Sequence, residues 1–185
     1  MARRRSVLRE LLETAVLTIG IFLVVKVAVQ NFKVEGDSML PNLHNGEYIL
    51  VNKVDYFIHP PERGDIVVFR AVPADAPDRD FIKRVIALPG ETVEVRANHH
   101  VYINGHRLYE PYKLYTPNYT FGPKTVPKDD YFVLGDHRSN SDDSHMWATT
   151  WLPKEDIIGK AWISYWPPKD AALLHASPRV QAGGK

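Results

Sequence analysis

The sequence contains no cysteine, which excludes disulfide bonds, thiolate metal sites and a cysteine nucleophile. A chain without thiols can work in a reducing or an oxidising compartment, so this absence leaves the compartment open. The sequence also contains no internal repeat, and its body shows little sign of a long amphipathic helix. Its 185 residues are enough for one ordinary domain with a small appendage.

An excess of charge of one sign is also missing. The chain has 23 basic and 22 acidic residues, a formal net charge of +1. Residues 1–31 hold five of the basic and two of the acidic residues, a net of +3, so the remainder has 18 and 20, a net of −2. Because the body carries no basic stripe, we expect no nucleic-acid partner.

One long hydrophobic run lies near the N-terminus. Leu11–Val29 is dominated by apolar residues, and its only charges, Glu13 and Lys26, lie towards its two ends. As a helix the run would be about 28 Å long, close to the hydrocarbon thickness of a bilayer. Four arginines precede it, and basic residues favour the cytoplasmic side. We therefore predict a basic cytoplasmic segment over residues 1–10, a transmembrane anchor over 11–31 and an extracytoplasmic body.

A cleaved secretory signal is the main alternative for this run. The uncharged stretch Thr14–Val25 has a suitable length for one. However, Lys26 follows it directly, and Ala28-Val29-Gln30 lacks the small residue that a cleavage site needs at its last position. An amphipathic core helix of a soluble protein is the third alternative.

The body, residues 32–168, consists of short apolar runs separated by glycine, proline, asparagine and aspartate. Asn104-Gly105 is a dipeptide preferred in type I′ hairpin turns, because both central residues need positive φ. The pattern predicts a mainly β domain, a folded sheet or a barrel. Seven runs are typical of strands: Tyr48–Val51, Asp65–Phe69, Phe81–Ile86, Thr92–Val95, Val101–Ile103, Tyr131–Leu134 and Gly159–Tyr165.

Three segments lack a strand pattern. Arg70–Asp80 and the proline- and tyrosine-rich Glu110–Pro127 are predicted to be surface loops, the second held down by its tyrosines. Residues 169–185 are predicted to form a poorly ordered tail.

The first polar motif is Gly36-Asp37-Ser38-Met39-Leu40-Pro41. A serine in such a turn more often bonds the backbone than attacks a substrate, so the hexapeptide alone is weak evidence. Its position adds information, because an extended chain puts Ser38 at most about 23 Å from the membrane edge.

The second motif, Phe81–Ile86, places a lysine on a predicted strand. Phe81, Lys83 and Val85 share one face, so Lys83 either extends to solvent at an edge or lies in an apolar pocket. In the pocket, desolvation would lower its pKa and yield a neutral amine that can deprotonate a serine. Arg84, on the opposite face, is expected to remain solvated.

The third motif, Gly135–His145, is a loop of short polar side chains that often satisfy their own backbone. Asp136, Asp142 and Asp143 with His137 and His145 also suggest a metal site, but no pair has a recognised ligand spacing and Arg138 lies among them. We therefore predict no metal. The other histidines are scattered, and none fits a Ser–His–Asp triad.

In this order, and after one N-terminal span, these segments resemble type I signal peptidases over nearly the whole body. The similar segments read GDSMLPNLHNGEYILVNK, RGDIVVF, FIKRVIALPGETVEV and YFVLGDHRSNSDDSH. The resemblance implies a folded β-sheet domain that removes signal peptides from exported precursors after a small-x-small motif, commonly Ala-x-Ala. It implies acyl-enzyme catalysis without a cofactor.

The resemblance also implies roles for particular residues. Ser38 matches the nucleophile, Lys83 the general base, and Ser141 a serine that orients the lysine amine. Met39 matches a residue near the pocket for the side chain that precedes the scissile bond. The polar residues matching those that support the site are Asp136, Arg138 and Asp143.

Two positions depart from the family pattern. Some members have a serine in place of Gly36, where its hydroxyl stabilises the oxyanion, so the second oxyanion donor here is left unassigned. The family usually has arginine where His145 stands, which puts the ion pairing around Asp143 in doubt.

Two other functions compete with the peptidase. A LexA-like self-cleaving Ser–Lys protease would share the dyad and the β-fold, but it predicts a DNA-binding domain that the pattern does not show, and the hydrophobic span is unexpected for it. A membrane-tethered β-domain that binds peptides without cutting them is made plausible by Gly36 and His145.

The expected partners are precursor proteins and the lipid bilayer, and a bacterial plasma membrane is the simplest location, with thylakoid and mitochondrial inner membranes as alternatives. The sequence does not indicate an oligomeric state.

Overall fold

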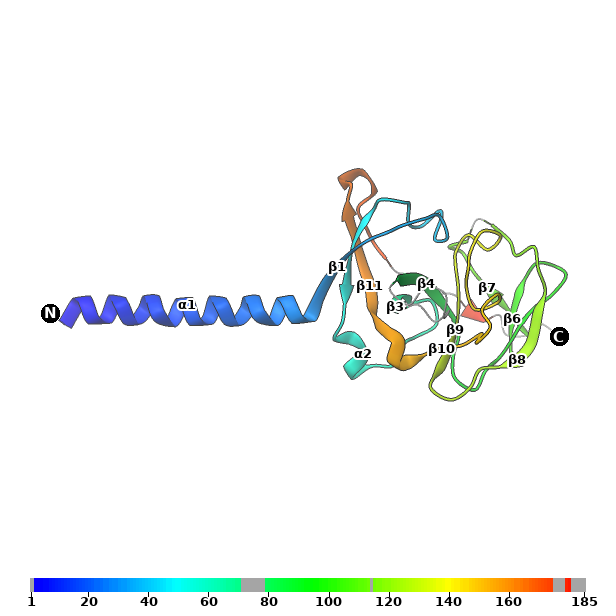
Figure 1. The fold of residues 1–185 in the computed structure, drawn as a ribbon, viewed down its shortest axis with the longest axis horizontal. Helices are drawn as coiled ribbons and strands as arrows, with labels where there is room; N and C mark the ends of the chain where they lie inside the picture. Colours follow the sequence, from blue (N-terminus) through cyan, green and yellow to red (C-terminus); the bar gives the residue numbers. More distant parts are fainter. Residues whose placement is uncertain (1, 71–78, 114, 175–178, 181–185) are drawn as a thin grey trace.

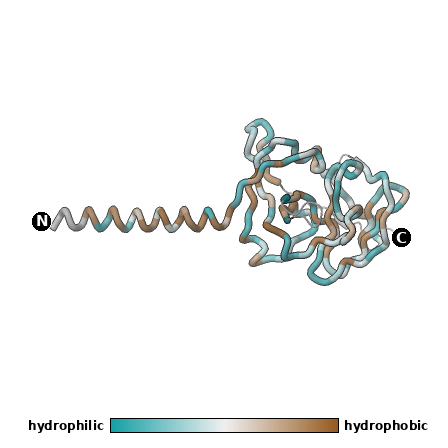
Figure 2. Tube along the Cα trace, viewed as in Figure 1, coloured by the Kyte–Doolittle hydropathy of each residue, from teal (hydrophilic) through white to brown (hydrophobic). Residues whose placement is uncertain are grey.

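A single long helix leads directly into a β-rich body (Figure 1). The computed structural model describes residues 2–70, 79–113, 115–174 and 179–180. Helix α1 (Ala2–Ala28) is followed without a linker by strand β1 (Val29–Lys33). Its segment Val7–Ala28 is long and apolar enough to cross a membrane, and none of it is buried in the protein. Figure 2 shows hydrophobic residues along most of this helix.

The helix ends earlier than the predicted anchor over residues 11–31. Val29, Gln30 and Asn31 are in β1, because their backbone pairs with Asn52, Val51 and Leu50 of the neighbouring strand. Strand pairing therefore ends the helix at Ala28.

An eight-stranded sheet forms the part of the body nearest the helix. Its order is β1-β2-β11-β3-β4-β9-β10, and β12 pairs with β11. Every neighbouring pair is antiparallel. The strands are β2 (Tyr48–Asn52), β3 (Ile66–Arg70), β4 (Asp80–Ala87), β9 (Asp130–Leu134), β10 (Leu152–Pro153), β11 (Ile157–Trp166) and β12 (Ala172–Leu173).

A five-stranded sheet, in the order β13-β7-β6-β5-β8, lies farther from the helix. Its strands are β5 (Thr92–Val95), β6 (Val101–Ile103), β7 (His106–Tyr109), β8 (Phe121–Thr125) and β13 (Arg179–Val180). Asn104 and Gly105 join β6 to β7, with φ of 51° and 80°. The predicted hairpin turn and its positive φ values are therefore confirmed. Three short helices complete the described elements: α2 (Asp55–Ile58), η1 (Lys154–Asp156) and η2 (Pro168–Asp170).

All seven predicted strands are present, which confirms the mainly β class. The structure differs at two predicted irregular segments. Glu110–Pro127 contains β8, which pairs with β5 although Gly122 and Pro123 interrupt its pattern. In the predicted tail, Ala172–Leu173 pairs with β11 and Leu174 is buried. The predicted loop Arg70–Asp80 falls mostly on 71–78, outside the described residues.

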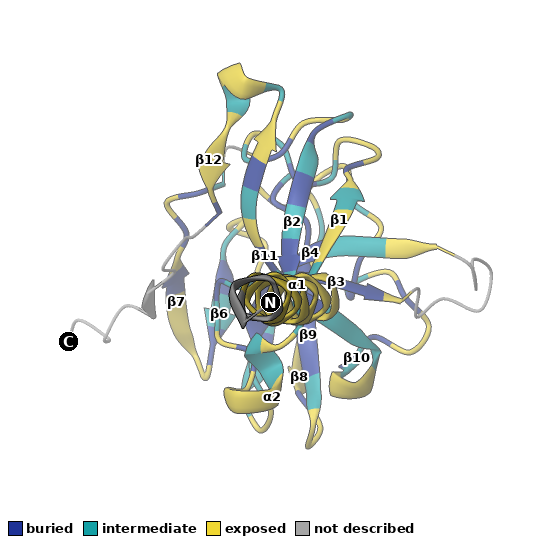
Figure 3. Cartoon of the chain, turned by 90° about the vertical axis from the view of Figure 1, so that its left-hand side faces the viewer, coloured by how far each residue is buried: buried dark blue, intermediate teal, exposed yellow. Residues whose placement is uncertain are grey.

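The hydrophobic core fixes both chemical motifs. Met39 and Leu43 lie in a buried cluster with Ile49 and Val51, so the loop between β1 and β2 is held against the sheet. Val85 lies in a second buried cluster at the middle of the same sheet. Viewed along α1, the helix is exposed over its described length and the buried residues are in the body (Figure 3). The loop with Ser38 and the strand with Lys83 are thus both rigidly supported.

Candidate active site

Ser38 and Lys83 lie together, although 45 positions separate them in the sequence. The Lys83 Nζ is 2.8 Å from the Ser38 Oγ, within hydrogen-bond distance. It is also 3.0 Å from the carbonyl oxygen of Ile82. Lys83 is only 3% exposed, whereas Ser38 is partly exposed, so a substrate can reach the hydroxyl while the amine stays shielded.

Burial changes the acidity of this lysine. Desolvation lowers the pKa of Lys83 from 10.5 to about 8, although the carboxylates of Asp143, Asp142 and Asp136 act in the opposite direction. The Phe81 ring lies 5.5 Å from the amine and belongs to its apolar surroundings. The buried alternative for Lys83 is therefore the one that the structure shows.

The polar loop after β9 is attached directly to the loop of Ser38. The His137 N–H donates to the Ser38 carbonyl oxygen at 2.9 Å. Gly135 is packed so closely that a Cβ there would lie 2.5 Å from the Ser38 carbonyl oxygen and 2.3 Å from the Ser141 Oγ. Only glycine fits this position without moving its neighbours.

Ser141 therefore packs against Gly135, next to the backbone of Ser38, but it makes no hydrogen bond to the amine. Its Oγ is buried and has no hydrogen-bond partner among the described residues. The amine of Lys83 is instead within hydrogen-bond distance of Ser38 and Ile82. The orienting role of Ser141 stays a prediction.

Asp136 forms a buried ion pair with Arg84. Its two carboxylate oxygens accept from the Arg84 Nε at 2.7 Å and from its terminal nitrogen at 2.6 Å. Asn42 donates to the same carboxylate at 2.8 Å, and the ring of Tyr112 stacks 4.0 Å from the guanidinium. Arg84 is 1% exposed, so the expectation that it remains solvated is wrong. The far face of β4 is also covered, and Arg84 lies in a polar interior.

Arg138 forms a second buried pair, with Glu110. Its guanidinium donates to both Glu110 oxygens and its Nε donates to the Gly135 carbonyl at 2.9 Å. Burial alone would raise the pKa of Glu110, but Arg138 and Lys113 outweigh burial and hold that pKa below its usual value. Asp136 and Arg138 thus both attach the first residues of the polar loop to buried partners in the body.

Asp143 has a hydrogen-bond partner in the histidine that stands where the family usually has arginine. The His145 Nδ1 lies 2.6 Å from one Asp143 oxygen, and the Gly135 N–H donates to the other at 2.9 Å. The ring of Tyr119 stacks on His145 at 3.6 Å between centroids and 5° between planes. His145 therefore contacts Asp143 where the family usually has arginine, and the guanidinium's charge and fork geometry are absent there.

The resemblance places Met39 and Gly36 near the substrate, but neither residue lines the cavity at Ser38. Met39 is buried in the core cluster rather than lining the cavity at Ser38. Gly36 is exposed, has φ of +85°, and donates its N–H to the Asn45 side chain at 3.1 Å. Because Gly36 has no side-chain hydroxyl and its N–H is already bonded, the second oxyanion donor stays unassigned.

A cavity of about 140 Å³ opens beside the dyad. Both Ser38 and Lys83 line it, and most of the remaining wall is apolar. The other lining residues come from β1 and the segment after it, from β2 and β3, and from the start of β4: Phe32, Lys33, Val34, Glu35, Ile49, Val68, Asp80, Phe81 and Ile82. The cavity is large enough to hold one side chain of a bound peptide.

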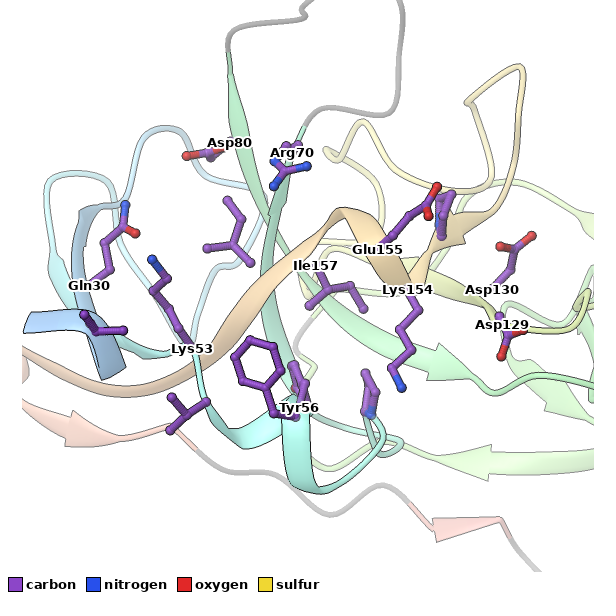
Figure 4. Close-up of a pocket in the computed structure, with 16 residues that line it drawn as sticks. Gln30, Lys53, Tyr56, Arg70, Asp80, Asp129, Asp130, Lys154, Glu155 and Ile157 are labelled. Atoms are coloured by element: carbon purple, nitrogen blue, oxygen red, sulfur yellow. The ribbon is translucent and has the colours of Figure 1, made fainter. Parts of the chain in front are cut away.

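A larger open groove, of about 1260 Å³, lies elsewhere and contains neither Ser38 nor Lys83. It runs along one end of the large sheet, from Gln30 and Lys53 beside α1 to Asp130 and Lys154 (Figure 4). Its size alone does not make it the reactive site, because it lacks the nucleophile and base.

The sequence did not identify Arg84 as the ion-pair partner of Asp136, or Glu110 as the ion-pair partner of Arg138. The pairs are separated by 52 and 28 positions. The only sequence signal for them is an acidic or basic residue next to a predicted buried run, which does not identify its partner. The predicted packing of the tyrosines is confirmed, since Tyr119 and Tyr115 stack on His145 and His137.

Comparison with known proteins gives a consistent result. Residues 8–166 match the protein family described as signal peptidase, peptidase S26. The chain is 42% identical over 171 residues to signal peptidase I of Leptolyngbya laminosa, covering 87% of this chain and 83% of that protein. It is 46% identical to probable signal peptidase I-1 of a Synechocystis strain, covering 72% and 69%. It is 40% identical to the chloroplastic thylakoidal processing peptidase 1 of Arabidopsis thaliana, covering 71% and 40%.

Proposed function

Since the chain belongs to the signal peptidase I family, peptidase S26, and is a serine endopeptidase, we propose that Ser38 is its nucleophile and Lys83 its general base. One observation carries the proposal: a buried amine lies 2.8 Å from a partly exposed hydroxyl. Family membership also decides against the non-catalytic peptide-binding domain and the LexA-like protease.

The reaction is acyl transfer. Neutral Lys83 accepts the Ser38 proton while the Oγ attacks the scissile carbonyl carbon. The resulting ammonium gives its proton to the leaving amine as the acyl-enzyme forms. The neutral amine then activates a water that hydrolyses the ester and releases the signal peptide. The Ser38 N–H makes no hydrogen bond to the described residues, so it is free to stabilise the oxyanion.

The supporting residues hold this geometry. Asp136, Arg138 and Asp143 fix the loop that contacts the Ser38 backbone. Ser141 belongs to the same loop, and the orienting role that the resemblance implies for its buried, unpartnered Oγ is part of the proposal. Met39 acts indirectly, because it packs in the same cluster as Val34, Ile49 and Val68, which line the cavity.

The substrate is an exported precursor cleaved after a small-x-small motif. The resemblance implies that the side chain before the scissile bond is small, and we infer that it enters the cavity of about 140 Å³ beside the dyad. The cavity lies between the segment after β1 and the start of β4, which can offer backbone hydrogen bonds to an extended peptide.

Incubation of the detergent-solubilised protein with an Ala-x-Ala precursor tests this function. We expect cleavage after the second alanine, identified by mass spectrometry of both products. A precursor in which leucine replaces that alanine is the matched control, and we expect its cleavage to fall by about 10²-fold or more because the resemblance implies a small residue at this position. Equal cleavage of the two precursors would contradict the assigned specificity.

The rate should depend on pH through Lys83. Only the neutral amine is active, so the rate rises as pH increases through a pKa of about 8 and falls about tenfold per unit below it. Measurement of kcat/KM on a soluble peptide from pH 5 to 10 checks this. A rate that is constant from pH 5 to 9 would argue against a lysine base.

The membrane confines enzyme and precursor to one surface and so raises their effective concentration. We infer that the basic N-terminus is cytoplasmic and the body extracytoplasmic. A bacterial plasma membrane is the simplest location, and a thylakoid membrane meets the same physical requirements.

A further inference from the structure

The most exposed large hydrophobic residues of the described body lie beside the end of α1. Phe57 is 86% and Ile58 76% exposed. Both belong to α2 (Asp55–Ile58), which follows β2 closely. Single exposed hydrophobic residues are common on soluble proteins, but two neighbouring side chains at these exposures leave a substantial apolar surface uncovered.

The position of α2 along the anchor is fixed by the backbone. The Lys53 N–H donates to the Ala28 carbonyl oxygen, at the last residue of α1, at 2.8 Å. Val27 and Phe57 line the same groove, and Figure 3 shows α2 next to the helix when viewed along it. If α1 crosses the bilayer up to Ala28, α2 is at the level of the lipid headgroups.

The exposure of these residues is not due to a loosely attached helix. Tyr56, between Asp55 and Phe57, packs against a buried cluster and donates its hydroxyl to Asp65 at 3.0 Å. Lys160 pairs with the same Asp65 at 2.7 Å. The inner side of α2 therefore packs against the body and is hydrogen-bonded to it, whereas its outer side exposes Phe57 and Ile58.

We propose that Phe57 and Ile58 insert into the interfacial region of the bilayer, as a second membrane contact beside α1. A helix end that is joined directly to a sheet leaves the body little freedom to move away, and burial of these two side chains in lipid removes their apolar surface from water. The contact fixes how the body is rotated about the anchor, and with it the height of Ser38 above the membrane.

Site-directed spin labelling of the full chain in phosphatidylcholine–phosphatidylglycerol proteoliposomes tests this contact. Because the native sequence has no cysteine, Phe57→Cys provides a single thiol for a nitroxide. We expect collisions with lipid-soluble oxygen to exceed those with a water-soluble nickel complex. The matched control is Tyr109→Cys, which is also exposed but lies in β7, far from α1 (Figure 1); there nickel should dominate.

Ile58→Cys repeats the test in case the first variant does not fold, and cleavage of a soluble peptide verifies folding of each. If the labels at both positions collide with nickel as often as the label at Tyr109→Cys does, the proposed contact is overturned. The readout does not depend on catalysis, so that result would leave the roles of Ser38 and Lys83 untouched.

Discussion

Replacement of Lys83 by alanine is expected to lower the rate of precursor cleavage by about 10⁴-fold or more, as loss of a residue that acts together with the nucleophile does in other serine proteases. Without the amine, no described basic group is within hydrogen-bond distance of the Ser38 Oγ, so the hydroxyl keeps its proton. Ser38→Ala should have an effect of similar size, because the two residues act in one step. Rates under single-turnover conditions measure both.

The effect must be separated from a general loss of charge or of fold. Lys169→Ala is the matched control, because its side chain is 80% exposed and does not line the cavity beside the dyad; it should cleave at the normal rate. Lys83→Met keeps much of the buried volume without a base, so it should fold but not cleave. Retention of normal turnover by Lys83→Met would refute the general-base role.

Loss of the buried Arg84 is expected to have the largest effect on stability. Arg84→Met leaves the Asp136 carboxylate buried with Asn42 as its remaining side-chain donor. Breaking such a pair typically lowers the free energy of unfolding by about 3–5 kcal/mol. Urea denaturation of the full chain in detergent, followed by tryptophan fluorescence of the body, measures the change.

Two controls assign this effect to the unpaired charge. In the double variant Arg84→Met with Asp136→Leu no charge is left buried, so we expect it to be more stable than Arg84→Met alone. Glu94→Gln removes a surface pair with Arg96 and should change the free energy of unfolding by less than about 1 kcal/mol. A single variant no less stable than the double variant would show that the pair is not needed to neutralise Asp136.

The parts of the fold that could be predicted are those that depend on local pattern. Runs of alternating or continuous apolar residues between breakers gave all seven predicted strands. β8 was missed because Gly122 and Pro123 are breakers locally, and only pairing with β5 makes that segment a strand. The helix end was misplaced for the same reason, since the pairing of Val29–Asn31 with β2 is a tertiary effect.

The site could be predicted only in part, because proximity in space is not encoded by one motif. Ser38 and Lys83 were identified through the resemblance and the order of the segments, and their contact spans 45 positions. The error at Arg84 arose from the assumption that one face of β4 is solvated. Residues Lys83–Ala87 are all buried, so alternation along that strand separates two interiors rather than an interior from water.

The central claim is that burial lowers the pKa of Lys83 far enough for part of the amine to be neutral near physiological pH, and its titration tests this most directly. NMR of the protein with ¹³C-labelled lysine side chains, assigned with the Lys83→Met variant, follows the ε-carbon shift of Lys83 as pH increases. The account predicts a midpoint of about 8, below the roughly 10.4 of a solvated lysine. A midpoint at or above that solvated value would contradict it.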